Sequence, residues 1–160
     1  MLFSDSPINI TTDGKRHLGA ALGSDTFKNE YIDEKVKKWV NTITSLANIA
    51  RTQPHAAYAA FIHAEQHKYT YFLRTIANIS ENLKPLDDAI DNVFIPALFG
   101  SDITANERQI LSLPIKEGGL GLRKVAMNAD SSYNVSVKVT QPLIRQIMQQ
   151  CDDLPTVNEV

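Results

Sequence analysis

The chain has 160 residues, of which 43% are hydrophobic and 21% are charged, and its formal net charge is −2. This length and composition are typical of one globular domain with its own core. No apolar run approaches the roughly 18–20 residues of a membrane-spanning helix, and the single Cys151 excludes an internal disulfide framework. The N-terminus has no signal-peptide pattern, and the single cysteine fits a reducing compartment, so the cytoplasm or the nucleus is favoured. The acidic balance counts against a dedicated nucleic-acid-binding domain, which is usually basic.

Residues 1–23 predict an irregular or β-like segment, because Pro7, Gly14, Gly19 and Gly23 interrupt it. We interpret this segment as the remnant of a domain that begins upstream, followed by a helical domain over residues 24–150.

A long amphipathic helix is predicted over residues 26–51, with Ser24 and Asp25 at its N-cap. Apolar residues recur there at helical spacing, at Ile32, Val36, Trp39, Ile43, Leu46, Ala47 and Ala50. Pro54 marks a break and a restart, since proline is accepted in a first helical turn. The next helix, over residues 55–78, carries several aromatic residues on its apolar face and is predicted to be the central buried helix.

A third helix is predicted over residues 83–98. Ser80 is a suitable cap for its start and Gly100 a suitable stop. Pro96 is expected to kink or shorten this helix, because proline donates no backbone hydrogen bond.

Thr104 and Glu107 have the spacing of a capping box, which predicts a short helix that ends near Ser112. The stretch LPIKEGGLGL, at 113–122, predicts a tight turn, because the residue before a proline leaves the helical region and glycine accepts positive φ. The residues assigned to this turn are Pro114, Gly118, Gly119 and Gly121.

Residues 124–150 predict one or two further helices, divided near Pro142 if there are two. The acidic tail 151–160 is expected to be flexible. The whole pattern predicts a mostly α-helical bundle of about five or six helices, preceded by a short irregular or β-like segment.

The sequence contains a pair of aspartates and a pair of histidines, residue types that bind metal ions, and we interpret both pairs without a metal. Asp87 and Asp88 precede apolar residues at helical spacing, so we expect acids of a first helical turn rather than the metal-binding pair of a β-hairpin. His63 and His67 could share a metal ion on one helix face, but Glu65 is not beside the first histidine as H-E-x-x-H requires. We therefore predict no catalytic residue, no metal ligand and no cofactor.

Basic side chains are the remaining candidates for a function. Lysine and arginine bind nucleic-acid phosphates when they gather on one face, although most charge runs are solvated surface. The candidates for nucleic-acid binding are Lys37, Lys38, Lys68, Arg74, Arg123 and Lys124.

Three segments in this order carry a resemblance to a known family. They are HLGAALGS at 17–24, YFLRTI at 71–76 and LPIKEGGLGL at 113–122. The chain from about His17 to Gln150 resembles the region downstream of the polymerase core in reverse transcriptases of non-LTR retroelements.

The resemblance implies a thumb-like helical region that follows the palm and holds a primer–template duplex through backbone and minor-groove contacts. Lys68 and Arg74 would be the first contacts, unless Arg74 pairs with an acid in the helical core. The aromatic-x-Asp-Asp motif of an RNA-directed DNA polymerase is absent from the sequence. We therefore expect a non-catalytic fragment of such an enzyme.

Two other functions stay open at this point. The first is a helical protein–protein interaction module, with an exposed apolar patch that could also drive self-association. The second is a metal-dependent hydrolase built on His63 and His67. Duplex binding should weaken steeply with salt, whereas an apolar contact should not.

Overall fold

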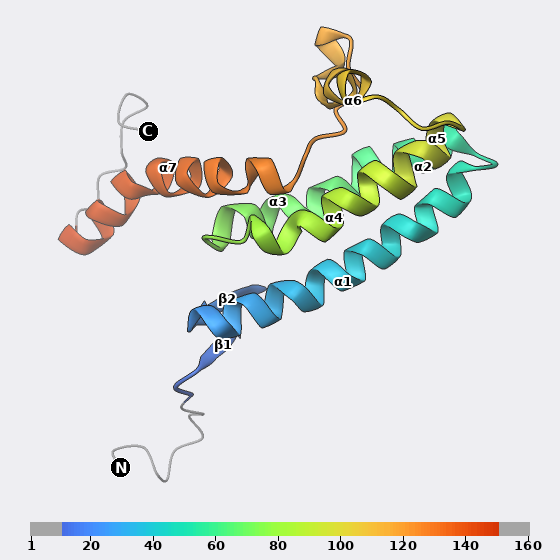
Figure 1. Cartoon of the computed structure of the whole chain (residues 1–160). Helices are drawn as coiled ribbons and strands as arrows, with labels where there is room; N and C mark the ends of the chain where they lie inside the picture. Colours follow the sequence, from blue (N-terminus) through green and yellow to red (C-terminus); the bar gives the residue numbers. More distant parts are fainter. Residues whose placement is uncertain (1–10, 151–160) are drawn as a thin grey trace.

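The computed structural model describes residues 11–150, which form a helical bundle with a two-stranded sheet at one end (Figure 1). This architecture confirms the predicted mostly α-helical fold and its β-like N-terminal segment. Residues 1–10 and the predicted tail 151–160, with Cys151, lie outside the described residues.

The helices form five segments between residues 11 and 150. The elements are β1 (Gly14–His17), β2 (Ala20–Gly23), α1 (Asp25–Ala50), α2 (Pro54–Ala60) continuing through η1 (Phe61–Glu65) into α3 (Gln66–Thr75), η2 (Glu81–Leu83) and α4 (Lys84–Ala89) continuing through η3 (Ile90–Phe94) into α5 (Ile95–Phe99), α6 (Ala105–Ser112), the short turns η4 (Ile115–Glu117) and η5 (Ala126–Asn128), and α7 (Ala129–Gln149). These bounds lie close to the predicted ones.

The predicted helix ends are mostly confirmed. The Ser24 hydroxyl accepts a hydrogen bond from the Phe27 N–H, and Gly100 ends α5 with φ 74°. Thr104 and Glu107 form the reciprocal capping box, and the bonds from the Thr104 N–H and hydroxyl lower the pKa of the Glu107 carboxyl. Ser80 precedes η2, but its side chain makes no capping bond, so this predicted cap is wrong in detail.

Both central helical segments contain a π-helical turn. The Ile95 N–H donates to the Ile90 carbonyl five residues earlier, immediately before Pro96. Pro96 cannot donate a backbone hydrogen bond, and the wider turn before it lets the helix continue to Phe99, where the sequence analysis expected a kink or a shorter helix. The rings of Phe61 and Phe94, one from each π-helical turn, stack with centroids 5.0 Å apart.

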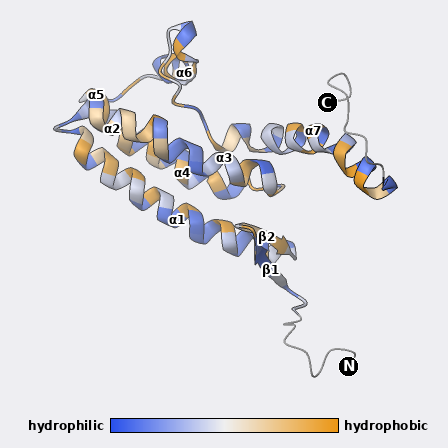
Figure 2. Cartoon of the chain, turned by 180° about the vertical axis from the view of Figure 1, so that it is seen from behind, coloured by the Kyte–Doolittle hydropathy of each residue, from blue (hydrophilic) through white to orange (hydrophobic). Residues whose placement is uncertain are grey.

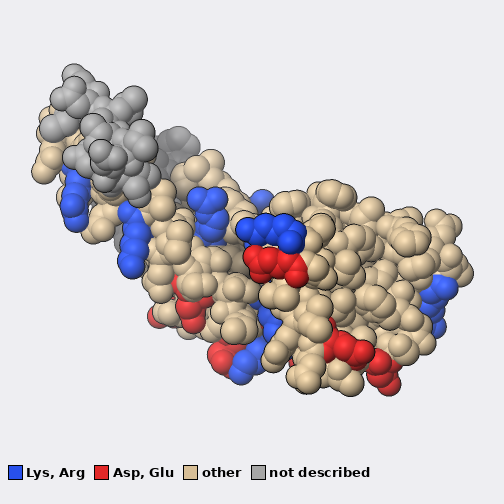
Figure 3. Space-filling model, turned by 90° about the horizontal axis from the view of Figure 1, so that it is seen from above, with Lys and Arg blue, Asp and Glu red and all other residues tan. Residues whose placement is uncertain are grey.

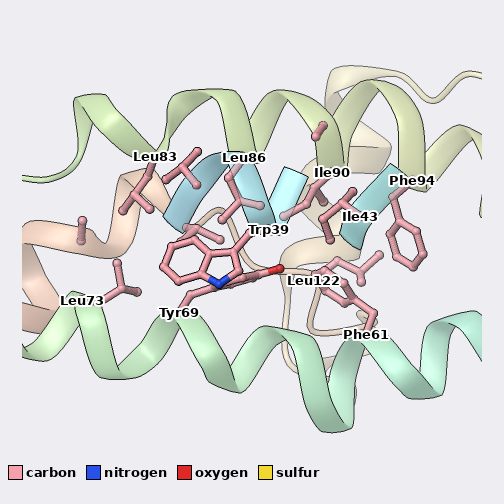
Figure 4. Close-up of a cluster of buried hydrophobic side chains, with 14 of the residues drawn as sticks. Trp39, Ile43, Phe61, Tyr69, Leu73, Leu83, Leu86, Ile90, Phe94 and Leu122 are labelled. Atoms are coloured by element: carbon pink, nitrogen blue, oxygen red, sulfur yellow. The ribbon is translucent and has the colours of Figure 1, made fainter. Parts of the chain in front are cut away.

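The core lies where α1 meets the two central segments (Figure 4). The Trp39 ring of α1 makes edge contacts with Tyr69 and Phe72 of α3, at centroid distances of 5.1 and 5.0 Å. Leu86 and Ile90 are fully buried from the other central segment. The aromatic face of the second predicted helix is therefore part of the core, as expected.

Helix α7 packs beside α3 and then extends past the end of the bundle (Figure 1). It runs as one helix through Pro142, and Figure 1 shows that it changes direction in its second half. Of the two predicted alternatives, one helix or two, the structure has the first.

Candidate nucleic-acid interface

The hairpin of β1 and β2 ends in an exposed and strained turn. Lys15 pairs with Leu22 and His17 with Ala20, which leaves Leu18 and Gly19 as the two turn residues. Both have positive φ, 48° for Leu18 and 92° for Gly19. Leucine enters the left-handed region only at a cost of about 1–2 kcal/mol, yet the Leu18 side chain is 86% exposed and gains little from burial. Positive φ at both central residues is what a two-residue type I′ hairpin turn requires, and leucine is an unusual residue at the first of them.

Two tyrosines hold this turn against the bundle. The Tyr71 hydroxyl of α3 donates to the Leu18 carbonyl at 2.7 Å, and the Tyr31 hydroxyl of α1 donates to the Gly19 carbonyl at 2.6 Å. Both rings also contact Phe72. The helices therefore fix the position of the turn and leave the Leu18 side chain directed away from the core.

The glycines at the base of the hairpin are required by close contacts. A Cβ on Gly23, where φ is 144°, would lie 2.3 Å from the Gly14 Cα, and a Cβ on Gly14 would lie 2.5 Å from the Phe27 ring. The segment HLGAALGS is thus a hairpin turn, a return strand and the N-cap of α1 in succession.

The first strand places cations beside the exposed turn. Lys15, Arg16 and His17 are exposed, and neither Lys15 nor Arg16 forms an ion pair with another described residue. The sequence analysis did not select Lys15 and Arg16. The signal that could have found them is a run of three nitrogen-bearing side chains directly before the turn residues.

A groove of about 300 Å³ lies between α3 and α7 at the same end of the bundle. Thr70 and Arg74 line it from α3, one helical turn apart. The α7 side carries Ser131, Ser132, Val135, Ser136 and Val139. The lining therefore combines hydroxyl groups and one guanidinium with two valine side chains, around a space that is open to solvent.

Arg74 makes no ion pair within the described part of the chain, so the alternative of a core pair with an acid is not what the structure contains. Tyr71, which holds the hairpin turn, is on the same stretch of α3. The Arg74 guanidinium and the hairpin cations consequently belong to the same end of the molecule. Lys68, by contrast, pairs with the buried carboxylate of Glu65.

The other predicted cations are spread over the molecule. Lys38 pairs with Glu34, and Lys37 lines a second groove between α1 and α4. Arg123 is exposed, whereas the Lys124 ammonium lies 3.7 Å from Asp91. Figure 3 shows the blue side chains separated by tan and red ones on the face it displays, not merged into one basic surface.

The aspartates of the third helix have a structural role. Asp87 lies in the first turn of α4, as predicted, and its two carboxylate oxygens accept hydrogen bonds from the Val125 and Ala126 N–H groups. Burial raises the pKa of Asp87, and the two backbone bonds oppose that shift. One turn later, Asp91 pairs with buried Arg108, which also donates to a backbone carbonyl.

The turn at 113–122 is structural as well. Gly118 and Gly121 have positive φ, as expected, but Gly119 does not. Glycine is instead required at position 119 because the backbone of Leu113 comes close to it. A Cβ there would lie 2.1 Å from the Leu113 carbonyl oxygen. Within the same turn, the Gly119 N–H donates a hydrogen bond to the Pro114 carbonyl.

A small polar cluster lies inside the bundle at the end of the first π-helical turn. Glu65 and Tyr69 are almost fully buried, and the Glu65 Oε1 and the Tyr69 hydroxyl have no hydrogen-bond partner among the described residues. Burial, and then the negative charge of Glu65, raise the pKa of Tyr69. Lys68 is the single ion-pair partner of Glu65 in the described chain.

His63 and His67 are both exposed on the second helical segment. Residues 11–150 contain no cluster of three or more histidine, cysteine or acidic residues arranged to hold a metal ion. Within the same residues, no helix combines the length and hydropathy needed to cross a membrane.

Comparison with protein families, with curated proteins and with solved structures found no match to this chain.

Proposed function

We propose that this chain is a non-catalytic, thumb-like module that contacts the backbone of a primer–template duplex with the end of the bundle formed by the hairpin and α3. The observation that carries the proposal is the clamped turn, in which strained Leu18 is exposed beside Lys15 and Arg16. A protein surface that reads duplex shape needs cations for phosphates and a rigid contact for the groove.

The division of roles follows from the geometry. Lys15 and Arg16 would neutralise phosphates and release their counterions. Leu18, held by the hydroxyls of Tyr31 and Tyr71, would contact the sugar edges of the wide, shallow minor groove of an A-like heteroduplex. Arg74 would contact phosphate on the adjacent strand through its open groove. Lys37, Lys38, Arg123 and Lys124 are not part of this surface.

The resemblance to retroelement reverse transcriptases supports the same proposal, because HLGAALGS and YFLRTI are the two segments that meet here. The Tyr71 hydroxyl, from the second segment, bonds to the Leu18 carbonyl of the first. Two motifs that are 53 residues apart in sequence therefore build one structural unit.

The test is equilibrium binding of a fluorescein-labelled RNA–DNA heteroduplex, followed by fluorescence anisotropy at low salt. We expect K15A/R16A to weaken binding by about tenfold or more, since two phosphate contacts are removed. The matched control is K84A/K116A, which removes the same charge from exposed lysines on other elements. Leu18→Gly should weaken binding while retaining the turn, because glycine adopts positive φ without strain.

Three results would contradict the proposal. The first is no binding by the folded wild-type chain at low salt. The second is equal weakening by the two double variants, which would indicate a non-specific charge effect. The third is an unchanged affinity of K15A/R16A with unchanged helicity by circular dichroism.

The second candidate function is a protein–protein interaction module, favoured by a different observation. Helix α7 exposes more large hydrophobic side chains than any other described element. Exposed apolar surface that is gathered on one element is typical of an interaction site.

A further inference from the structure

The groove between α3 and α7 contains side-chain hydroxyls that the fold does not use. Figure 2 shows that α7 begins beside α3 and then continues past it, and the groove lies along the stretch that the two helices share. The hydroxyls of Thr70, Ser132 and Ser136 line this groove and form no hydrogen bond with another residue of the described chain.

Most helical hydroxyls elsewhere in residues 11–150 are occupied. A serine or threonine inside a helix can bond back to a backbone carbonyl three or four residues earlier. The hydroxyls of Thr42, Thr75 and Thr140 donate in this way. Ser131, which also lines the groove, donates to the carbonyl three residues before it. The three remaining groove hydroxyls are therefore left for a ligand, and so is the guanidinium on the α3 side.

The burial of the lining residues gives the groove a floor and two rims. Ser132 and Ser136 are half-buried and one turn apart on α7, so they form the floor where α7 faces α3. Exposed residues form the rims, which are Thr70 and Arg74 on α3 and Val135 and Val139 on α7. A ligand in the groove thus meets hydroxyls beneath it, one cation on one rim and methyl groups on the other.

We infer that the groove binds one ribose-phosphate unit of an RNA strand, so that the RNA strand of the heteroduplex is the one that lies along α3 and α7. A single guanidinium matches the single charge of a phosphodiester. The ribose 2′-hydroxyl both donates and accepts hydrogen bonds, as the floor hydroxyls do. The valine methyls would pack against the C–H face of the sugar, a contact that a phosphate group alone does not make.

This inference rests on the proposed function, because it assigns a strand to the phosphate contact of Arg74. It adds a means of telling RNA from DNA. A deoxyribose in the groove would leave the floor hydroxyls of Ser132 and Ser136 covered and without a partner, which weakens binding.

The experiment is fluorescence anisotropy of the full chain with two labelled heteroduplexes of one sequence. The first is RNA–DNA, and in the second fluorine replaces each 2′-hydroxyl of the RNA strand, which keeps the A-like shape without the O–H group. We expect the wild-type chain to bind RNA–DNA about fivefold or more tightly, since at least one hydrogen bond is lost in the fluorinated duplex. S132A/S136A should remove this preference and leave the affinity for the fluorinated duplex unchanged.

The matched control is T42A/S45A, which removes two exposed hydroxyls of α1 that bond within their own helix. It should retain the full preference. If S132A/S136A lowers the helicity measured by circular dichroism, Thr70→Val takes its place, because valine keeps the shape of threonine without the hydroxyl. A reduced preference in Thr70→Val supports the assignment, and an unchanged one contradicts it.

The outcomes separate this inference from the proposed function. Equal wild-type affinity for the two heteroduplexes, with binding still weakened by K15A/R16A, would overturn the RNA-strand assignment alone. So would a preference that folded S132A/S136A retains. Displacement of the heteroduplex by adenosine 5′-monophosphate at an equal concentration of nucleotide units would assign the groove to a free ribonucleotide instead. No binding of either heteroduplex would overturn both proposals.

Discussion

The carboxylate of Asp87 joins two parts of the chain that are 38 residues apart in sequence. Its oxygens accept the Val125 and Ala126 N–H groups at 2.7 and 3.0 Å and thereby fix the entry to η5 and α7. The sequence pattern placed this residue correctly in a first helical turn. It could not reveal the second role, because the donors come from a distant turn.

Asp87→Ala should destabilise the chain by about 2–3 kcal/mol, because two N–H groups lose their charged acceptor. Chemical unfolding followed by circular dichroism measures this loss. The control is Asp88→Ala, an exposed neighbour, for which we expect a change within about 0.5 kcal/mol. Equal effects of the two variants would show that the Asp87 bonds do not hold α7 in place.

The pH dependence of stability provides a second prediction for Asp87. Because burial raises its pKa in the folded chain, folding favours the protonated form. The stabilisation that comes from this tighter proton binding is therefore fully present below the pKa of an unfolded aspartate. It is lost as pH rises through the raised pKa of the folded chain. Relative to Asp87→Asn, which does not titrate, the free energy of unfolding of the wild type should decrease over that window. A difference that increases with pH would contradict this assignment.

Helical elements were predictable from the sequence where local signals agree with tertiary packing. Ser24, Pro54, Gly100 and the Thr104 capping box each start or end a helix by local chemistry, and the structure retains these boundaries. Ser80 differs because its backbone is already helical, so its hydroxyl is not placed to cap. For Pro96 the sequence predicts a kinked or shortened helix, because proline lacks an N–H donor, but it does not predict that a π-helical turn precedes the proline.

The glycine turn provides a prediction at the scale of one element. Gly119→Ala should cost at least about 1–3 kcal/mol, since its Cβ would overlap the backbone carbonyl of Leu113. Gly118→Ala should cost about 1–2 kcal/mol, because φ is 84° but nothing lies within 4 Å of the added carbon. Thermal unfolding of the two variants, side by side, measures the difference. A loss in Gly119→Ala that is smaller than in Gly118→Ala would mean that the close approach of the Leu113 carbonyl does not require glycine at position 119.

The cations of the described residues fall into two groups, those that form ion pairs within the fold and those that do not. Arg108 and Lys124 pair with Asp91 in the region that holds the glycine turn, whereas Lys15, Arg16 and Arg74 have no ion pair within residues 11–150. Composition could not show this division, since it depends on which acid lies near each cation. Arg74 was predictable as a candidate from its motif, but the hairpin cations became candidates only when Tyr31 and Tyr71 were seen to hold the turn.

The salt dependence of heteroduplex affinity tests the central claim most directly. For the wild-type chain, the logarithm of the association constant should fall linearly with the logarithm of salt concentration. K15A/R16A should reduce the magnitude of that slope by about 2, one for each lost phosphate contact. The K84A/K116A control should keep the wild-type slope. An affinity that does not change with salt, or a slope that is the same in K15A/R16A and the wild type, would contradict duplex contact by the hairpin end.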